Sequence, residues 1–295
     1  MMPVRAKIAS APISWGVCEV PGWGRVLDPP TVLGEMAELG VTATELGPPG
    51  YLPWDAAELR TLLDGHGLAL VGGFFATVLH QGGKSTVDEA GTLAELFAAA
   101  GGEVLVLAAA TGLDGYDERP QLSDAQWRTL VDTAGLIRDR AAEYGLRTVL
   151  HPHVGTHVEN ADEVDRFLAD SDLDLCVDTG HMLIGGADPV GVVLANPDRV
   201  GHVHLKDVRL DLVERVRQGE LSYTAAVAEG IYVPLGDGDV DVSAILKSLR
   251  DNGYDGWYVL EQDTALATED TSADGEPKRC TERSLGYLSS VLNGQ

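Results

Sequence analysis

Short runs of apolar residues alternate with longer amphipathic stretches along nearly the whole chain. This alternation is typical of repeated strand–helix units that build a parallel sheet. We expect strands at Ile8–Ser14, Thr42–Leu46, Ala69–Phe75, Glu103–Ala108, Arg147–His151, Leu173–Asp178, Val200–Leu205 and Trp257–Glu261. The amphipathic stretches predict helices at Pro30–Leu39, Ala56–His66, Val87–Ala100, Asp124–Tyr144, Ala161–Ala169 and Val242–Asn252.

Glycines punctuate these units where a helix C-cap favours them, at Gly40, Gly67, Gly145 and Gly253. Eight such units predict a single (β/α)8 TIM barrel, of class α/β, that spans residues 1–295 as one domain. In such barrels the active site lies at the C-terminal ends of the strands. We therefore look for chemistry at those ends.

One connection, Asp207–Pro234, is longer than the others, and we expect a short helix in it at Tyr223–Glu229. It is either a lid or substrate loop, or a solvent-exposed excursion. After the last strand, residues Asp263–Pro277 are expected to loop over the barrel mouth before a final helix at Thr281–Leu292.

Composition narrows the class of protein. The chain has 46 acidic and 21 basic residues, a formal net charge of −25, which opposes binding to nucleic acid. It has no apolar run of membrane-spanning length and no signal-peptide pattern at its start, so we expect a cytoplasmic protein without a membrane partner. The cysteines Cys18, Cys176 and Cys280 show no ligand spacing, and we interpret them as small buried residues rather than ligands. The oligomeric state is left open between a monomer and a homo-oligomer.

Four of the predicted strands end in residue types that bind metals: His151, Asp178, His204 and Glu261. Because strand ends meet at one mouth of a barrel, these side chains are expected to converge on one divalent ion. Mixed nitrogen and oxygen ligands suit Mn, Co, Fe, Ni or Zn better than Ca or Mg. We expect Mn²⁺ or Co²⁺, with Fe, Ni, Zn and Mg as alternatives.

Alternate residues of a strand share a face, so His153 points the same way as His151. Which of the two is the ligand is left open. Further polar residues follow the strands at the same mouth, and we take Glu45, His181, Lys206 and His153 as candidate acid–base groups.

Candidate substrate contacts come from large side chains near the strand ends. Trp15, Phe75, Tyr51 and Trp54 are candidates for an apolar wall against a sugar ring, although each residue type is also common in a core. Arg209, shortly after His204, is a further candidate contact to substrate.

Several strings together resemble one known family. They are Ala43-Thr-Glu-Leu-Gly-Pro-Pro-Gly, His151-Pro-His-Val-Gly-Thr156, Asp178-Thr-Gly-His181 and His202-Val-His-Leu-Lys-Asp-Val-Arg209. They resemble the inosose dehydratase branch of the xylose isomerase-like TIM barrels, a superfamily that also holds sugar-phosphate isomerases and epimerases. The resemblance runs from Ala11 to Glu261, and it implies that Asp178, His204 and Glu261 are metal ligands.

At the end of the fifth strand the chain departs from the isomerase and epimerase pattern, where a Glu is usual. His151 in its place resembles the dehydratase branch. The substitution also removes one of the two carboxylates that epimerases use as paired acid and base.

The reaction that the resemblance implies is loss of water from a cyclic keto-polyol such as 2-keto-myo-inositol (scyllo-inosose), a step of inositol catabolism and carbohydrate metabolism. The ion would stabilise an enediolate, and a general acid would protonate the departing hydroxyl. The sequence does not assign base and acid. An isomerase, epimerase or eliminase acting on another keto-sugar or keto-glycoside, and a non-catalytic binding barrel, stay open. A DNA-repair endonuclease of the same fold is disfavoured, because it would need more metal-binding residues and a basic cleft.

Overall fold

Eight parallel strands close into a barrel in the computed structural model, which describes residues 6–18, 20, 22–267 and 275–294. The order around the barrel is β1-β10-β7-β6-β5-β4-β3-β2, so each strand lies beside its neighbour in the chain. The barrel strands are β1 (Lys7–Ser10), β2 (Ala43–Glu45), β3 (Ala69–Thr77), β4 (Val104–Ala109), β5 (Arg147–Leu150), β6 (Asp174–Asp178), β7 (Val200–Leu205) and β10 (Trp257–Leu260). The predicted (β/α)8 barrel is confirmed.

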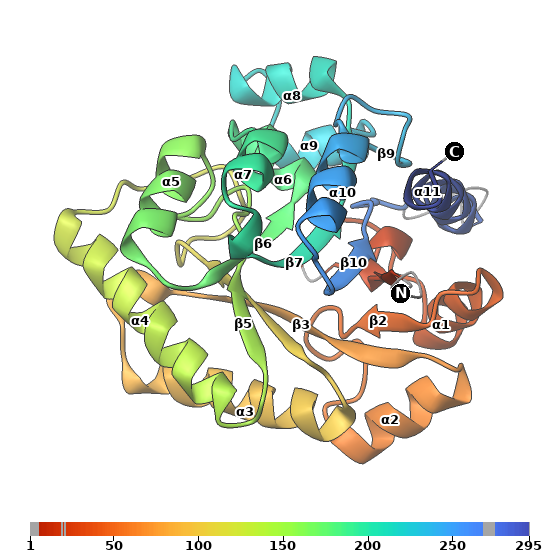
Figure 1. Cartoon of the computed structure of the whole chain (residues 1–295), viewed down its shortest axis with the longest axis horizontal. Coiled ribbons are helices and arrows are strands. Elements are labelled where there is room, and N and C mark those ends of the chain that lie inside the picture. The colour runs from red at the N-terminus through yellow and green to blue at the C-terminus, as the bar shows by residue number, and fades with distance from the viewer. Residues whose placement is uncertain (1–5, 19, 21, 268–274, 295) are drawn as a thin grey trace.

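The helices lie outside the strands, as Figure 1 shows. They are α1 (Pro29–Glu38), α2 (Ala56–Gly65), α3 (Lys84–Ala100), α4 (Asp124–Ala142), α5 (Ala161–Asp170), α6 (Thr179–Gly185), α7 (Pro189–Ala195), α8 (Leu210–Arg217), α9 (Tyr223–Ala228), α10 (Val242–Asp251) and α11 (Glu276–Leu292). None of the helices in the described part of the chain is long and apolar enough to cross a membrane.

Some predicted boundaries were wrong. The first strand stops at Ser10, and Pro12–Trp15 form a 3₁₀ helix instead, because Pro12 has no N–H to continue the ladder. Helices α6, α7 and α8 were not predicted. The final helix begins at Glu276, earlier than the predicted Thr281.

The long connection folds into structure of its own. It contains α8, α9 and a two-stranded antiparallel sheet of β8 (Asp207–Val208) and β9 (Tyr232–Val233). The buried Asp207 carboxylate accepts the N–H groups of Gly236, Gly238 and Val240 at 2.8–3.0 Å, and so closes the turn after the connection. The short helix predicted at Tyr223 is confirmed.

Alternate strand residues fill the barrel interior. Two small apolar clusters lie there, one of Ala9, Ala11, Ala43, Val71 and Val259 and one of Val104, Val106, Val149 and Cys176. The site residues occupy the next inward positions along the same strands, two residues after Ala43, Val149, Cys176 and Val259. The polar site therefore sits directly on an apolar floor, which also contains the buried His202, two residues before His204.

Candidate functional site

Three of the four predicted metal ligands converge at the C-terminal mouth of the barrel. Ligand atoms of Asp178, His204 and Glu261 all lie within 4.8 Å of one another. His204 Nδ1 is 3.2 Å from Glu261 Oε2 and 3.7 Å from Asp178 Oδ2. All three side chains are nearly inaccessible to solvent.

The fourth residue, His151, joins the group through Asp178. Its Nε2 lies 3.3 Å from Asp178 Oδ2. His153 lies further along the cavity wall, where its Nδ1 is 2.7 Å from the Val154 carbonyl oxygen. This placement favours His151 over His153 as the fourth ligand.

Asp178 ends β6 and starts α6, and its two oxygens have different tasks. Oδ1 accepts the backbone N–H groups of Gly180 at 3.0 Å and His181 at 2.7 Å, as an N-cap does. Oδ2 faces the other ligands and is buried without a hydrogen-bond partner among the described atoms. The helix cap thus fixes the orientation of the free oxygen.

Glu45 organises two histidines. Its Oε1 lies 2.9 Å from His202 Nε2 and 3.0 Å from His204 Nε2. Burial opposes ionisation of this carboxyl, but the two imidazoles outweigh that effect and hold the pKa of Glu45 below its ordinary value. An ionised carboxylate only accepts hydrogen bonds, so both Nε2 atoms donate, and His204 presents Nδ1 to the site.

Lys206 lies among three carboxylates. Its Nζ is 3.3 Å from Asp178 Oδ2, 3.0 Å from Glu261 Oε2 and 2.7 Å from Asp263 Oδ1. Burial opposes the charge of the ammonium group, but these carboxylates prevail and raise the pKa of Lys206 well above its ordinary value. This direction favours the ammonium form of Lys206 near neutral pH over the free amine that a base would need.

His153 and His181 stack against each other, with ring centroids 3.7 Å apart. Because His153 Nδ1 donates to a carbonyl, its Nε2 is the basic nitrogen. Burial, aided by His151 and Lys206, lowers the pKa of His153 to about 3. His181 Nδ1 accepts the Val154 N–H at 3.5 Å, so its Nε2 carries the proton.

The Nε2 atom of His181 faces Asp263, whose Oδ2 lies 3.6 Å away. Burial, with His153 and Lys206 adding to it, also lowers the pKa of His181 well below its ordinary value. Two neutral imidazoles of opposite tautomer, one accepting and one donating, thus lie side by side.

These groups line a cavity that opens at the barrel mouth. Its lining residues are Ala11, Ile13, Val17, Cys18, Trp23, Glu45, Gly47, Phe74, Tyr116, His151, His153, His181, His204, Lys206, Tyr223, Glu261 and Asp263. Tyr223 comes from the long connection, which therefore supplies part of the wall. Of the two interpretations of this connection, the substrate loop fits its placement better than the solvent-exposed excursion.

The residues predicted to contact substrate lie elsewhere. Trp15 is fully buried in the core, where its Nε1–H donates to Glu35 Oε2 at 2.7 Å. Arg209 is half exposed and pairs with Asp211 at 2.7 Å. Neither residue lines the cavity. Tyr51 and Trp54 do not line it either: the Tyr51 hydroxyl bonds a backbone carbonyl and Trp54 is 47% exposed.

Phe74, not Phe75, reaches the cavity, because β3 carries a bulge. The register between β2 and β3 shifts between Thr44 and Glu45, which pair with Leu70 and Gly72. The extra residue reverses the in–out alternation beyond it. A side chain at Gly72 would place its Cβ 1.8 Å from the Val104 carbonyl oxygen, so the bulge requires glycine.

Four further residues belong to the site, and sequence patterns offered little indication of them. The Tyr223 hydroxyl lies 3.0 Å from that of Tyr232 and donates to Asp263 Oδ2 at 2.9 Å. Tyr116 packs edge-on against Tyr223, with ring centroids 5.5 Å apart. Only Asp263 had a usable signal, because it lies two residues after Glu261 and shares its face.

The residues fit a divalent cation. Lys206 pairs with three buried carboxylates, those of Asp178, Glu261 and Asp263, and Glu45 adds a fourth beside His204; a divalent ion would offset this excess of negative charge. Asp178 Oδ2 and His204 Nδ1 are buried and have no hydrogen-bond partner among the described atoms. Although burial opposes protonation, a buried thiol and two carboxylates raise the pKa of His204 well above its ordinary value. A cation that binds Nδ1 therefore displaces a proton.

Comparison with known proteins gives consistent results. The family model for the xylose isomerase-like TIM barrel matches residues 33–288. An inosose dehydratase of Geobacillus kaustophilus is 36% identical over 277 residues, which cover 88% of this chain and 89% of the relative. The rhizopine catabolism protein MocC of Rhizobium meliloti is 36% identical over 269 residues, or 86% and 81% of the two chains. The crystal structure of the probable 3-DHS dehydratase AsbF from Bacillus anthracis matches with a TM-score of 0.69 at 18% identity, over 96% of this chain and 98% of that one, and so supports the fold.

Proposed function

The chain belongs to the xylose isomerase-like TIM barrel family, and from this premise we propose that it is a metal-dependent hydro-lyase acting on a cyclic keto-polyol such as scyllo-inosose. The observation that carries the proposal is the buried cluster of Asp178, His204 and Glu261 at the floor of a cavity, in a chain 36% identical to an inosose dehydratase. The cytoplasmic location and a homo-oligomeric state stay predictions from the sequence.

Asp178, His204 and Glu261 would hold the divalent ion, with His151 as the fourth ligand. Mn²⁺ or Co²⁺ suits this set of nitrogen and oxygen donors best. When bound, the ion would act as a Lewis acid toward the ketone and so make the neighbouring C–H group more acidic.

His153 is the proposed base, in place of Glu45. Its Nε2 is unprotonated near neutral pH and its ring lies in the cavity wall, whereas Glu45 is occupied by two histidines. The base removes the proton from the carbon next to the ketone, and the C–O bond at the following carbon breaks. The enol that remains becomes the second ketone of a dione.

His181 is the proposed acid. Its Nε2 faces Asp263 Oδ2 at 3.6 Å, and a proton passed from Nε2 to the departing hydroxyl would release that group as water. The proton that His153 has taken up would then return to His181 across the adjacent rings and leave both imidazoles neutral. The Lys206 ammonium fixes Asp263 at 2.7 Å and so keeps this carboxylate in place. The two adjacent imidazoles thus have complementary tautomers for removing one proton and delivering another.

The test is to incubate the Mn²⁺- or Co²⁺-loaded protein with scyllo-inosose and follow dione absorbance. We expect dione formation that depends on the metal and is absent in His204→Ala. Exchange of a ring proton with solvent, without loss of water, would instead indicate an isomerase or epimerase. A preparation that binds no metal in stoichiometric amount would favour the non-catalytic barrel.

A further inference from the structure

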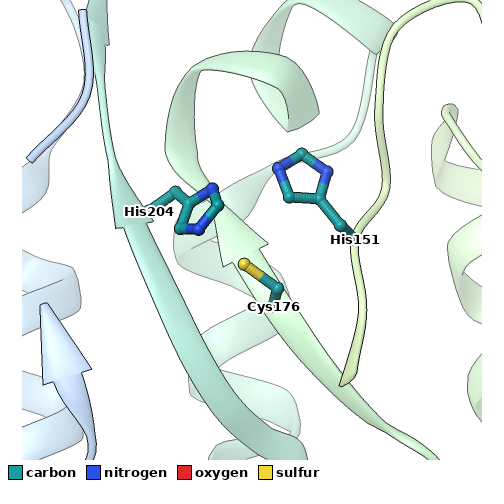
Figure 2. A group of neighbouring side chains, drawn as sticks. All are labelled: His151, Cys176 and His204. Carbon is teal, nitrogen blue, oxygen red and sulfur yellow. The ribbon is translucent and has the colours of Figure 1, made fainter. Parts of the chain in front are cut away.

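Cys176 lies beneath the carboxylate ligands, on the inward face of β6 two residues before Asp178. Its side chain is fully buried against the apolar floor of the barrel. Its sulfur lies within 4.8 Å of a ring nitrogen of His151 and of His204, and those two nitrogens are equally close to each other. Figure 2 shows the sulfur between the two imidazoles, carried by the strand that lies between theirs.

His151 and His204 are placed so that they could bind a metal ion together with Cys176. Each is only 2% exposed, and His204 Nδ1 is buried without a hydrogen-bond partner among the described atoms. In a tetrahedral zinc site with Zn–S of about 2.3 Å and Zn–N of about 2.0–2.1 Å, the ligand atoms lie roughly 3.3–3.6 Å apart. The three ligand atoms, which lie within 4.8 Å of one another, would have to move closer to reach that spacing.

We propose that the centre contains a second, thiol-containing ligand set, His151–Cys176–His204, which binds a thiophilic ion such as Zn²⁺ or Cd²⁺. Binding forms a metal–sulfur bond and releases the thiol proton to solvent, with no change in oxidation state. Soft thiolate and imidazole donors favour these ions, whereas the carboxylate-rich set favours harder ones.

The two ligand sets exclude each other. Both use the His204 imidazole, whose Nε2 is held by Glu45 at 3.0 Å and whose Nδ1 faces Asp178 and Glu261, so the two ions would compete for one ring. A thiophilic ion bound to Cys176 would therefore displace the ion of the carboxylate set. Inhibition of turnover by Zn²⁺ or Cd²⁺ is the consequence, and that consequence alone rests on the proposed function.

Titration of the chelator-treated full chain with Cd²⁺ tests the binding. We expect a near-ultraviolet sulfur-to-metal charge-transfer band that saturates at one ion per chain. The band should be lost in Cys176→Ser and Cys176→Ala and kept in Cys18→Ser and Cys280→Ser, the matched controls. A wild-type protein without the band, or a band that survives both Cys176 substitutions, overturns the proposal.

X-ray absorption of the zinc-loaded wild-type protein needs no variant. A sulfur neighbour at about 2.3 Å supports the thiol-containing set, and a shell of nitrogen and oxygen alone contradicts it. Neither measurement involves substrate. Failure of the thiol site is thus distinguishable from failure of the proposed reaction, which is judged by dione formation with Mn²⁺ or Co²⁺.

Discussion

The Glu45 carboxylate accepts the Nε2–H of His204 at 3.0 Å, from the opposite side of the imidazole to the one that faces Asp178 and Glu261. Such a carboxylate–histidine pair fixes the ring orientation and tautomer of a metal ligand and increases its basicity. The sequence alone led us to regard Glu45 as an acid–base group, because its carboxylate was expected at the barrel mouth. From these contacts we propose that it is a positioning residue instead.

Glu45→Gln should weaken metal binding by about 10–100-fold, because the amide cannot act as a charged acceptor for both imidazoles. Isothermal titration with Mn²⁺ measures the loss. Saturating metal should then restore most of the turnover. If the fully loaded variant remains as slow as a variant that lacks a proton-transfer group, Glu45 takes part in the chemistry after all.

Two substitutions of Asp178 can separate its role in metal binding from its role in capping helix α6. Asp178→Asn keeps an oxygen that can cap α6 but removes the charge, so we expect loss of metal retention with little change in the cap. Asp178→Ala should lose metal and, in addition, about 1 kcal/mol of unfolding free energy through the missing cap. Metal analysis and urea denaturation of both variants check this. Equal stability of the two variants would show that the cap contributes nothing.

The fold and the convergence of Asp178, His204 and Glu261 were predictable from the sequence because both depend on local periodicity. Strand lengths, helix ends and the ligand types after four strands repeat in register, and barrel geometry then brings them to one mouth. The local sequence pattern could not predict contacts between segments that are far apart in the chain. The bulge at Gly72 depends on β2, and the placement of Tyr223 depends on how the long connection folds back.

Trp15 illustrates the same limit. The sequence placed an aromatic residue just after the first strand, but could not show that Glu35 on α1 would accept its indole N–H. Burial in the core took Trp15 out of reach of the cavity. Local sequence thus identified neither the end of the first strand nor the direction of this side chain.

Trp15→Phe should therefore lower the stability of the fold, and Phe74→Leu should weaken substrate binding. The first removes a hydrogen bond of a buried indole, for a loss of about 1 kcal/mol in unfolding free energy with an unchanged KM. The second removes an aromatic ring whose centroid lies 5.7 Å from that of His151 and 5.6 Å from that of His153, and should raise KM. Denaturation curves and steady-state kinetics of both variants distinguish these roles. A raised KM for Trp15→Phe would indicate that Trp15 contacts substrate after all.

The stacked imidazoles predict which variant loses which step. His153→Gln should stop the exchange of the α-proton with solvent deuterium, and His181→Gln should leave the exchange intact while dehydration stops. Each should lower turnover by about 10²–10⁴-fold, as expected for a lost proton-transfer group. Deuterium incorporation into unreacted scyllo-inosose, followed by mass spectrometry, reports the first step. Exchange that persists in His153→Gln would assign the base elsewhere.

His157, which is not one of the proposed metal ligands, should make the free energy of unfolding depend on pH. It is 4% exposed, and burial, with His80 and Arg119 adding to it, lowers its pKa to about 4. An unfolded histidine has a pKa of about 6.5, so between roughly pH 6.5 and 4 the unfolded chain binds the additional proton, and stability falls as pH is lowered through that window. The slope from one such group is at most about 1.4 kcal/mol per pH unit.

His157→Gln should make the unfolding free energy decline less steeply between pH 6.5 and 5 than in the wild type. Urea denaturation at several pH values measures this decline. The matched control substitution is His66→Gln, at the end of α2. An equal decline in the two variants would show that protonation of His157 is not what destabilises the fold in acid.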